Sequence, residues 1–139
     1  MTIGIEWVNN YHSASSNLAN NDDNARGIYG RLHGQCQVEY GDDLAWDQDF
    51  EEAEAGTPSA GSDQIYADDV DIVFFSGHGM RFGASFGVKT LDDGVARASN
   101  MRLGNKDLEW LVADGCEMLA DDTGTVFSRW GRPTSRGLH

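Results

Sequence analysis

Cysteine and long apolar stretches are both scarce in this sequence of 139 residues. The two cysteines, Cys36 and Cys116, are too few for a disulfide framework and lack the paired Cys/His spacing of a zinc site, so neither disulfides nor a metal or other cofactor is expected. A reducing compartment is the simpler interpretation. No run of about 18 apolar residues occurs, and the start MTIGIEWVNNYH has no basic segment followed by a long apolar run. The sequence therefore predicts a cytoplasmic protein that makes no membrane contact.

Lysine is also rare, and acidic residues outnumber basic ones to give a formal net charge of -13. Much of the negative charge lies in aspartate pairs, at Asp22-Asp23, Asp42-Asp43, Asp68-Asp69, Asp92-Asp93 and Asp121-Asp122. Such a surface repels nucleic-acid phosphates and anionic lipid, which excludes both as partners, and it is typical of halophilic proteins. Calcium binding is the alternative, but no segment has the alternating oxygen ligands and closing glutamate of an EF-hand loop.

The length favours a single domain over residues 1–139, which is enough chain to bury about two thirds of the surface exposed on unfolding. The sequence ends at Gly137-Leu138-His139, which looks like the approach to a further strand. We therefore expect the domain to be incomplete at its carboxyl end. The oligomeric state stays open.

Apolar periodicity predicts two elements in the first third of the chain. Residues 3–8, IGIEWV, form an apolar run with one charge that is typical of a strand inside a sheet. A helix is expected over residues 18–32, because five apolar side chains share one helical face, although two glycines weaken it. A short strand around Val38 and Tyr40 and a helical turn over residues 47–53 are also expected.

The remaining pattern predicts a loop and two buried strands. Residues 54–63 mix Gly, Pro and Ser without periodicity and should form a surface loop. Residues 70–75, VDIVFF, read as a central strand covered on both faces, and residues 107–113, DLEWLVA, as a second buried strand. A glycine-rich hairpin around Phe82 and Phe86 lies between them. Strands separated by helical stretches indicate an α/β fold with a mostly parallel sheet.

A histidine and a cysteine follow the two predicted buried strands. His78 stands after VDIVFFSG, and Cys116 after DLEWLVADG. Functional side chains collect beyond the carboxyl ends of parallel strands, and an imidazole beside a thiol can take its proton and activate it. Gly79 has no Cβ, so its amide and that of Cys116 can approach a substrate oxyanion. The sequence predicts a His78/Cys116 catalytic dyad with an oxyanion hole at Gly79 and Cys116.

The blocks IVFFSGHG and LEWLVADGCEM resemble the clan of cysteine peptidases that includes caspases, metacaspases, legumain, gingipains and separase. The stretches IGIEWVNNYH, AWDQDF, QIYADDVDIVFFSGHG and LGNKDLEWLVADGCEML also look like a bacterial and archaeal family of unknown function with this fold. The resemblance implies a caspase-like three-layer αβα fold with a mostly parallel central sheet. It also implies a peptide or protein substrate. Nothing recognisable as the two later strands of a caspase-like sheet follows Cys116, and Glu117-Met118 differs from the motifs of caspases and metacaspases.

Asp114 stands two residues before the candidate nucleophile. In metacaspases an aspartate at this offset lines the primary specificity pocket, so the resemblance implies that Asp114 binds a Lys or Arg side chain of the substrate. Side chains alternate along an extended segment, so Asp114 and Cys116 should point the same way. The alternative is that Asp114 caps the turn through its own backbone.

Three functions follow as hypotheses: a caspase-like cysteine peptidase, a catalytically inactive caspase-like module that binds a peptide or partner, and a cysteine hydrolase of another acyl substrate. Cys36 lacks a partner and is expected to be structural. Trp46, Trp110 and Trp130 are expected in the core, and His12, His33 and His139 at the surface.

Overall fold

The computed structural model describes residues 1–12, 16–52, 61–81, 83–87, 93–118 and 120. Several sequence predictions fall outside these ranges: most of the predicted loop over residues 54–63, the hairpin residue Phe82, and the whole segment from residue 121, with Trp130, His139 and the expected incomplete end. Among the described residues, no helix is both long and apolar enough to cross a membrane.

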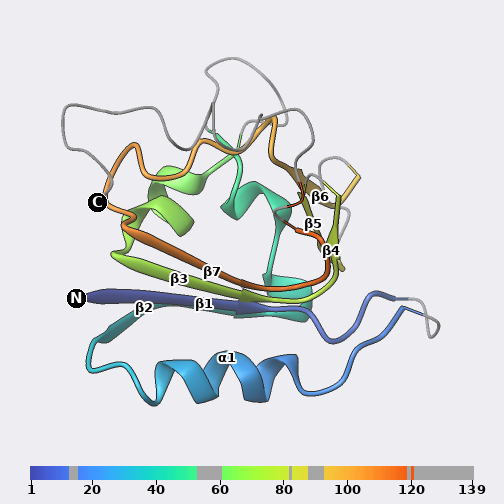
Figure 1. Ribbon diagram of the computed structural model, residues 1–139, viewed down its shortest axis with the longest axis horizontal. Coiled ribbons are helices and arrows are strands. Elements are labelled where there is room, and N and C mark those ends of the chain that lie inside the picture. The colour runs from blue at the N-terminus through green and yellow to red at the C-terminus, as the bar shows by residue number, and fades with distance from the viewer. Residues whose placement is uncertain (13–15, 53–60, 82, 88–92, 119, 121–139) are drawn as a thin grey trace.

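The described chain is built on one sheet of four parallel strands in the order β2-β1-β3-β7 (Figure 1). These strands are β1 (Thr2–Trp7), β2 (Gln35–Gly41), β3 (Ile72–Ser76) and β7 (Trp110–Asp114). Parallel neighbours require long crossover connections, and here these carry a helix, short turns and a second sheet. The predicted α/β class with a parallel sheet is confirmed.

The single α-helix described, α1 (Asn21–Tyr29), covers one face of this sheet, as Figure 1 shows below the strands. Its buried Ala25 packs against the side chains that β1 and β3 direct to that face, Ile3, Ile5, Trp7 and Phe74. The helix is shorter than the predicted range 18–32. It ends where the Gly30 N–H donates to the Arg26 carbonyl at 2.8 Å and the Arg31 N–H donates to the Ile28 carbonyl at 3.0 Å, and glycine disfavours continuation. Leu32 still packs on the same apolar cluster from beyond the helix.

The other face of the sheet is covered by 3₁₀ turns and a small antiparallel sheet. The turns are η1 (Asp42–Leu44), η2 (Asp47–Asp49), η3 (Asp63–Ile65) and η4 (Ala67–Asp69). The small sheet consists of β4 (Gly79–Met80), β5 (Gly83–Ser85) and β6 (Val95–Arg97). The expected turn over residues 47–53 corresponds to η2, and the expected hairpin to β4 and β5. The third strand, β6, was not predicted because it is only three residues long.

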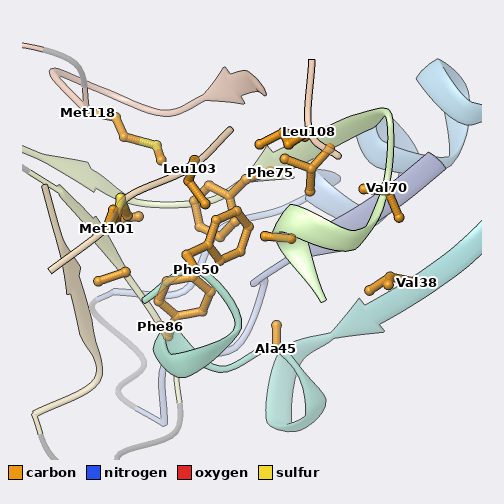
Figure 2. Close-up of a cluster of buried hydrophobic side chains, with 14 of the residues drawn as sticks. Val38, Ala45, Phe50, Val70, Phe75, Phe86, Met101, Leu103, Leu108 and Met118 are labelled. Carbon is orange, nitrogen blue, oxygen red and sulfur yellow. The ribbon is translucent and has the colours of Figure 1, made fainter. Parts of the chain in front are cut away.

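The larger apolar cluster lies between the parallel sheet and these turns (Figure 2). Three aromatic rings, Phe50, Phe75 and Phe86, contact one another with centroid separations of 5.0 to 5.7 Å. All three side chains are almost completely buried. Burial of each one stabilises the fold by about 1.5 to 3 kcal/mol, so this trio links β3 to the chain after η2 and to the chain after β5.

Four predictions of burial were wrong, those for the strand β7, for Trp110 and Trp46 as core residues, and for Asp63 as part of a surface loop. β7 is not a buried strand: Trp110 is 59% exposed and Val112 is 40% exposed, because α1 packs on β1 and β3 and leaves the same face of β7 open. Trp46 is also partly exposed, at 37%, rather than in the core. Conversely Asp63, at the end of the predicted surface loop, is fully buried because η3 folds against η2.

Candidate active site

The structure brings His78 and Cys116 to the carboxyl ends of two adjacent strands. In the parallel pair of β3 and β7, Ser76 is aligned with Asp114. His78 and Cys116 each follow two residues later, and the Gly77 N–H donates to the Asp114 carbonyl at 3.1 Å, which continues the pairing beyond the strands.

Two glycines allow the two strand-end loops to touch. A Cβ built on Gly79 would overlap the carbonyl oxygen of Cys116, and one on Gly115 would lie 3.0 Å from both the Gly77 oxygen and the Gly79 nitrogen. The histidine loop and the cysteine loop are therefore in backbone contact. Sequence reasoning assigned Gly79 to the oxyanion hole, and the structure shows a packing reason for glycine at the same position.

The His78 ring is held through one of its nitrogens. Its Nε2 lies 2.6 Å from the Ser16 carbonyl oxygen. Because a carbonyl can only accept a hydrogen bond, Nε2 must carry the hydrogen, and Nδ1 of the neutral ring is then an acceptor. The hydrogen bond from His78 Nε2 to the Ser16 carbonyl therefore selects the neutral tautomer with an unprotonated Nδ1. Sequence reasoning missed Ser16 because any residue type has a backbone carbonyl.

Tyr11 contacts both the backbone and the ring of His78. Its hydroxyl accepts a hydrogen bond from the His78 N–H at 2.6 Å, and the two ring centroids are 4.6 Å apart at an interplanar angle of 47°. Burial raises the pKa of Tyr11 to about 12, so the hydroxyl stays neutral at physiological pH. Sequence reasoning also missed this residue, which is 67 positions away from His78.

The two thiols have different surroundings. Cys116 is exposed in the turn after β7. The next residue, Glu117, has a left-handed φ of 54°, and Met118 is buried in the larger apolar cluster, so this turn is anchored on its carboxyl side. Cys36 on β2 is partly buried, its thiol lies 3.4 Å from the Val38 carbonyl, and burial raises its pKa.

Asp114 is exposed, and its carboxylate is tied to neighbouring elements. Its Oδ2 accepts hydrogen bonds from Ser76 Oγ on β3 and from Asn24 Nδ2 on α1, both at 3.0 Å. Both donors are neutral, so neither partner brings a positive charge to the Asp114 carboxylate.

The amino end of α1 is fixed at the same edge of the sheet by further polar side chains. Asn21 Nδ2 donates to the Val8 carbonyl at 2.6 Å, and the Asn21 N–H donates to Asn9 Oδ1 at 2.9 Å. Asn9 Nδ2 in turn donates to Asp22 at 2.7 Å, and this bond lowers the pKa of Asp22. Asn21 Oδ1 accepts from Ser76 Oγ at 3.1 Å, and Asn24 bonds to Asp114, so the helix start is joined to the ends of β1, β3 and β7.

Within the described part of the chain, no three His, Cys, Asp or Glu side chains are grouped so that they could hold a metal ion. The chemistry that the described residues offer at this edge is that of a thiol, an imidazole, a carboxylate and backbone amides.

Residues 5–139 match the family model described as a domain of unknown function, DUF6345. The chain belongs to this family, and the expectation of a family of unknown function is confirmed. A search of curated proteins found no match, and a search of solved structures found none either. The caspase-like relationship stays a prediction.

Proposed function

We propose that the chain is a caspase-like cysteine peptidase in which Cys116 is the nucleophile and His78 the general base. The observation that carries the proposal is the backbone contact between two strand-end loops, one bearing an imidazole of defined tautomer and the other an exposed thiol. Neither feature alone points to catalysis, because single histidines and cysteines at strand ends are common. Their juxtaposition beyond adjacent parallel strands is what supports the function.

The proposed reaction uses the free nitrogen of His78. Nδ1 takes the proton from the Cys116 thiol, and the thiolate attacks the carbonyl carbon of the substrate. The resulting imidazolium donates that proton to the leaving amine as the C–N bond breaks, which leaves a thioester. His78 then removes a proton from water, which attacks the thioester, and the proton returns to the sulfur as the acid is released.

The oxyanion formed in both steps is assigned to the amides of Gly79 and Cys116. The Gly79 nitrogen lies next to the cysteine loop, since a Cβ on Gly115 would lie 3.0 Å from it. Donors on rigid backbone stabilise a developing negative charge without reorganising at the moment of reaction. Loss of one such donor typically lowers the rate about a hundredfold or more.

A preference for Lys or Arg at the cleaved position is assigned to Asp114. Its exposed carboxylate stands two residues before Cys116, and Asn24 and Ser76 hold it without neutralising it. A charge-assisted hydrogen bond to a substrate cation is worth about 1.5 to 3 kcal/mol, which corresponds to about a tenfold to hundredfold preference. The acidic chain, with its net charge of -13, also attracts cationic peptides.

The three-layer αβα architecture of caspase-like proteins belongs to the same proposal. It is supported by α1 on one face of the parallel sheet and by the 3₁₀ turns on the other.

A binding module without catalysis is the second candidate. The exposed Trp110 and Val112 on β7 favour it, because large apolar side chains at a surface are typical of contact sites. Hydrolysis of another acyl substrate by the same dyad is the third.

Cleavage of a peptide library, read by mass spectrometry, separates these candidates. Wild type and Cys36→Ser should cleave after Lys or Arg, whereas Cys116→Ala should not cleave. Asp114→Ala should retain cleavage but lose the basic preference. Cleavage that persists in Cys116→Ala would contradict the assigned nucleophile. Turnover of simple thioesters or esters without any peptide cleavage would favour hydrolysis of another acyl substrate. An uncleaved library from which one peptide binds the protein would favour the binding module.

A further inference from the structure

The stretch between β1 and α1 reaches the candidate site with two of its residues. Tyr11 contacts the backbone and ring of His78, and Ser16 accepts the hydrogen bond from the His78 ring. The described residues on either side of 13–15 are joined to each other, because the Leu18 N–H donates to the Asn9 carbonyl at 2.9 Å and the Tyr11 N–H donates to Asn17 Oδ1 at 2.9 Å.

This stretch is also tied to the rest of the molecule. The backbone N–H groups of Asn9 and Asn10 both donate to Asp42 Oδ1, at 2.7 and 2.8 Å. Asp42 itself has a left-handed φ of 52° at the start of η1. The backbone just before Tyr11 is therefore anchored, which fixes the position from which the Tyr11 side chain reaches His78.

Tyr11 contacts His78 in two chemically distinct ways. The hydroxyl accepts the hydrogen bond of the His78 N–H two residues beyond the end of β3, while the His78 carbonyl accepts from the Ser85 N–H of β5 at 2.9 Å. The same hydroxyl lies close to Gly77, where a built Cβ would come within 2.8 Å of it. The ring lies against the imidazole and restricts its rotation, and an aromatic ring at this separation also stabilises a cationic partner.

We propose that Tyr11 is a positioning residue for His78, holding the imidazole so that Nε2 donates to Ser16 and Nδ1 is directed to its catalytic task. The inference rests on the proposed function for its catalytic meaning, but the placement of the His78 ring is measurable without any activity. Tyr11 is a positioning residue because its contacts in the structure are with the backbone and ring of His78.

Two variants and one control separate the contribution of the Tyr11 hydroxyl from that of the Tyr11 ring. Tyr11→Phe keeps the ring and removes the acceptor of the His78 N–H, whereas Tyr11→Leu removes both. Tyr29→Phe is the matched control. Tyr29 is the last residue of α1, whereas Asn21 at the other end of the helix lies at the sheet edge near the site. Thermal melting and the alkylation rate of Cys36 report whether each variant retains the fold.

The first readout is the tautomer of His78, measured by NMR on imidazole nitrogens labelled with ¹⁵N at a pH where the ring is neutral. Wild type, Tyr29→Phe and Tyr11→Phe should show hydrogen on Nε2. Tyr11→Leu should show a mixture of both tautomers, because the ring is no longer held against Ser16. A single Nε2–H tautomer in a folded Tyr11→Leu would overturn the positioning role.

The second readout is the rate of Cys116 alkylation by iodoacetamide between pH 5 and 9. Tyr11→Phe should slow alkylation at neutral pH by about tenfold, the equivalent of one hydrogen bond. Tyr11→Leu should slow it further and move the midpoint of the pH profile upward, because the imidazolium that accompanies the thiolate loses its aromatic neighbour. A wild-type profile in both folded variants would contradict the proposal.

The two proposals fail in different ways. If His78→Ala alkylates as fast as wild type, the dyad is wrong, and the tautomer measurement alone decides whether Tyr11 positions the ring. If His78→Ala is slow while the folded Tyr11 variants match wild type in both readouts, the dyad stands and the role of Tyr11 is wrong.

Discussion

Gly79 and Cys116 are in direct backbone contact across the ends of β3 and β7, so close that a methyl group on Gly79 would overlap the Cys116 carbonyl oxygen. This contact is what joins the histidine loop to the cysteine loop. Because the clash would involve backbone atoms, no side-chain rotation can relieve it.

We therefore expect Gly79→Ala to lower the free energy of unfolding by about 1 to 3 kcal/mol and to separate the two loops. Gly27→Ala is the matched control. Gly27 lies in α1 with open space where its Cβ would be, so alanine there should stabilise the fold by about 0.5 to 1 kcal/mol. Urea denaturation of both variants provides the comparison. Equal stability of Gly79→Ala and wild type would show that the loops are not packed in this way.

The stability of the protein should fall as the pH rises from about 4 to 7, because of two buried carboxyl groups. Glu6 on β1 is fully buried, and neither of its oxygens has a hydrogen-bond partner among the described residues; burial, and then the charge of Asp49, raise its pKa well above the usual range. Burial also raises the pKa of Asp49 to about 7. The folded protein therefore holds protons that the unfolded chain releases in this interval.

Glu6→Gln and Asp49→Asn should each remove part of this pH dependence and stabilise the protein at pH 8 by about 1 to 3 kcal/mol. Asp71→Asn is a control of opposite sign: hydrogen bonds from Thr2 lower the pKa of Asp71, so its contribution is lost towards acid pH. Denaturation series at several pH values measure all three. A wild-type stability that stays level or rises between pH 4 and 7 would contradict the assignment.

Salt should stabilise the protein, because a chain with a net charge of -13 repels itself until the charges are screened. The screening length falls from about 10 Å at 0.1 M to about 3 Å at 1 M salt. Thermal melts in a KCl series from low to molar concentration should show a rising melting temperature. A flat or falling series would refute the halophilic interpretation.

How much could be predicted from the sequence depended on whether a feature is local. The runs IGIEWV and VDIVFF are apolar enough to specify strands at the centre of a sheet on their own, and β1 and β3 were predicted close to their observed bounds. The run DLEWLVA has a similar pattern, yet β7 is open on one face. Whether a strand face is covered depends on the position at which α1 packs on the sheet, and the sequence of the strand itself does not specify this position.

The same distinction applies to the site. His78 and Cys116 were found because each follows its strand directly. Tyr11 and Ser16 were not, because they reach His78 through the path of the chain between β1 and α1, and a tyrosine or a backbone carbonyl carries no distinguishing motif. The hydrogen bonds of Asp114 to α1 and β3 were missed for the same reason.

Activation of Cys116 by His78 is tested by the alkylation rate of Cys116 in wild type and in His78→Ala at pH 6.5 to 7, about two units below the ordinary thiol range. Cys36, partly buried and with a raised pKa, serves as the internal control for the fold within each sample. We expect Cys116 to label faster than Cys36 in wild type, and His78→Ala to slow the labelling of Cys116 by at least about tenfold while that of Cys36 is unchanged. Equal labelling of Cys116 in both proteins would contradict this activation.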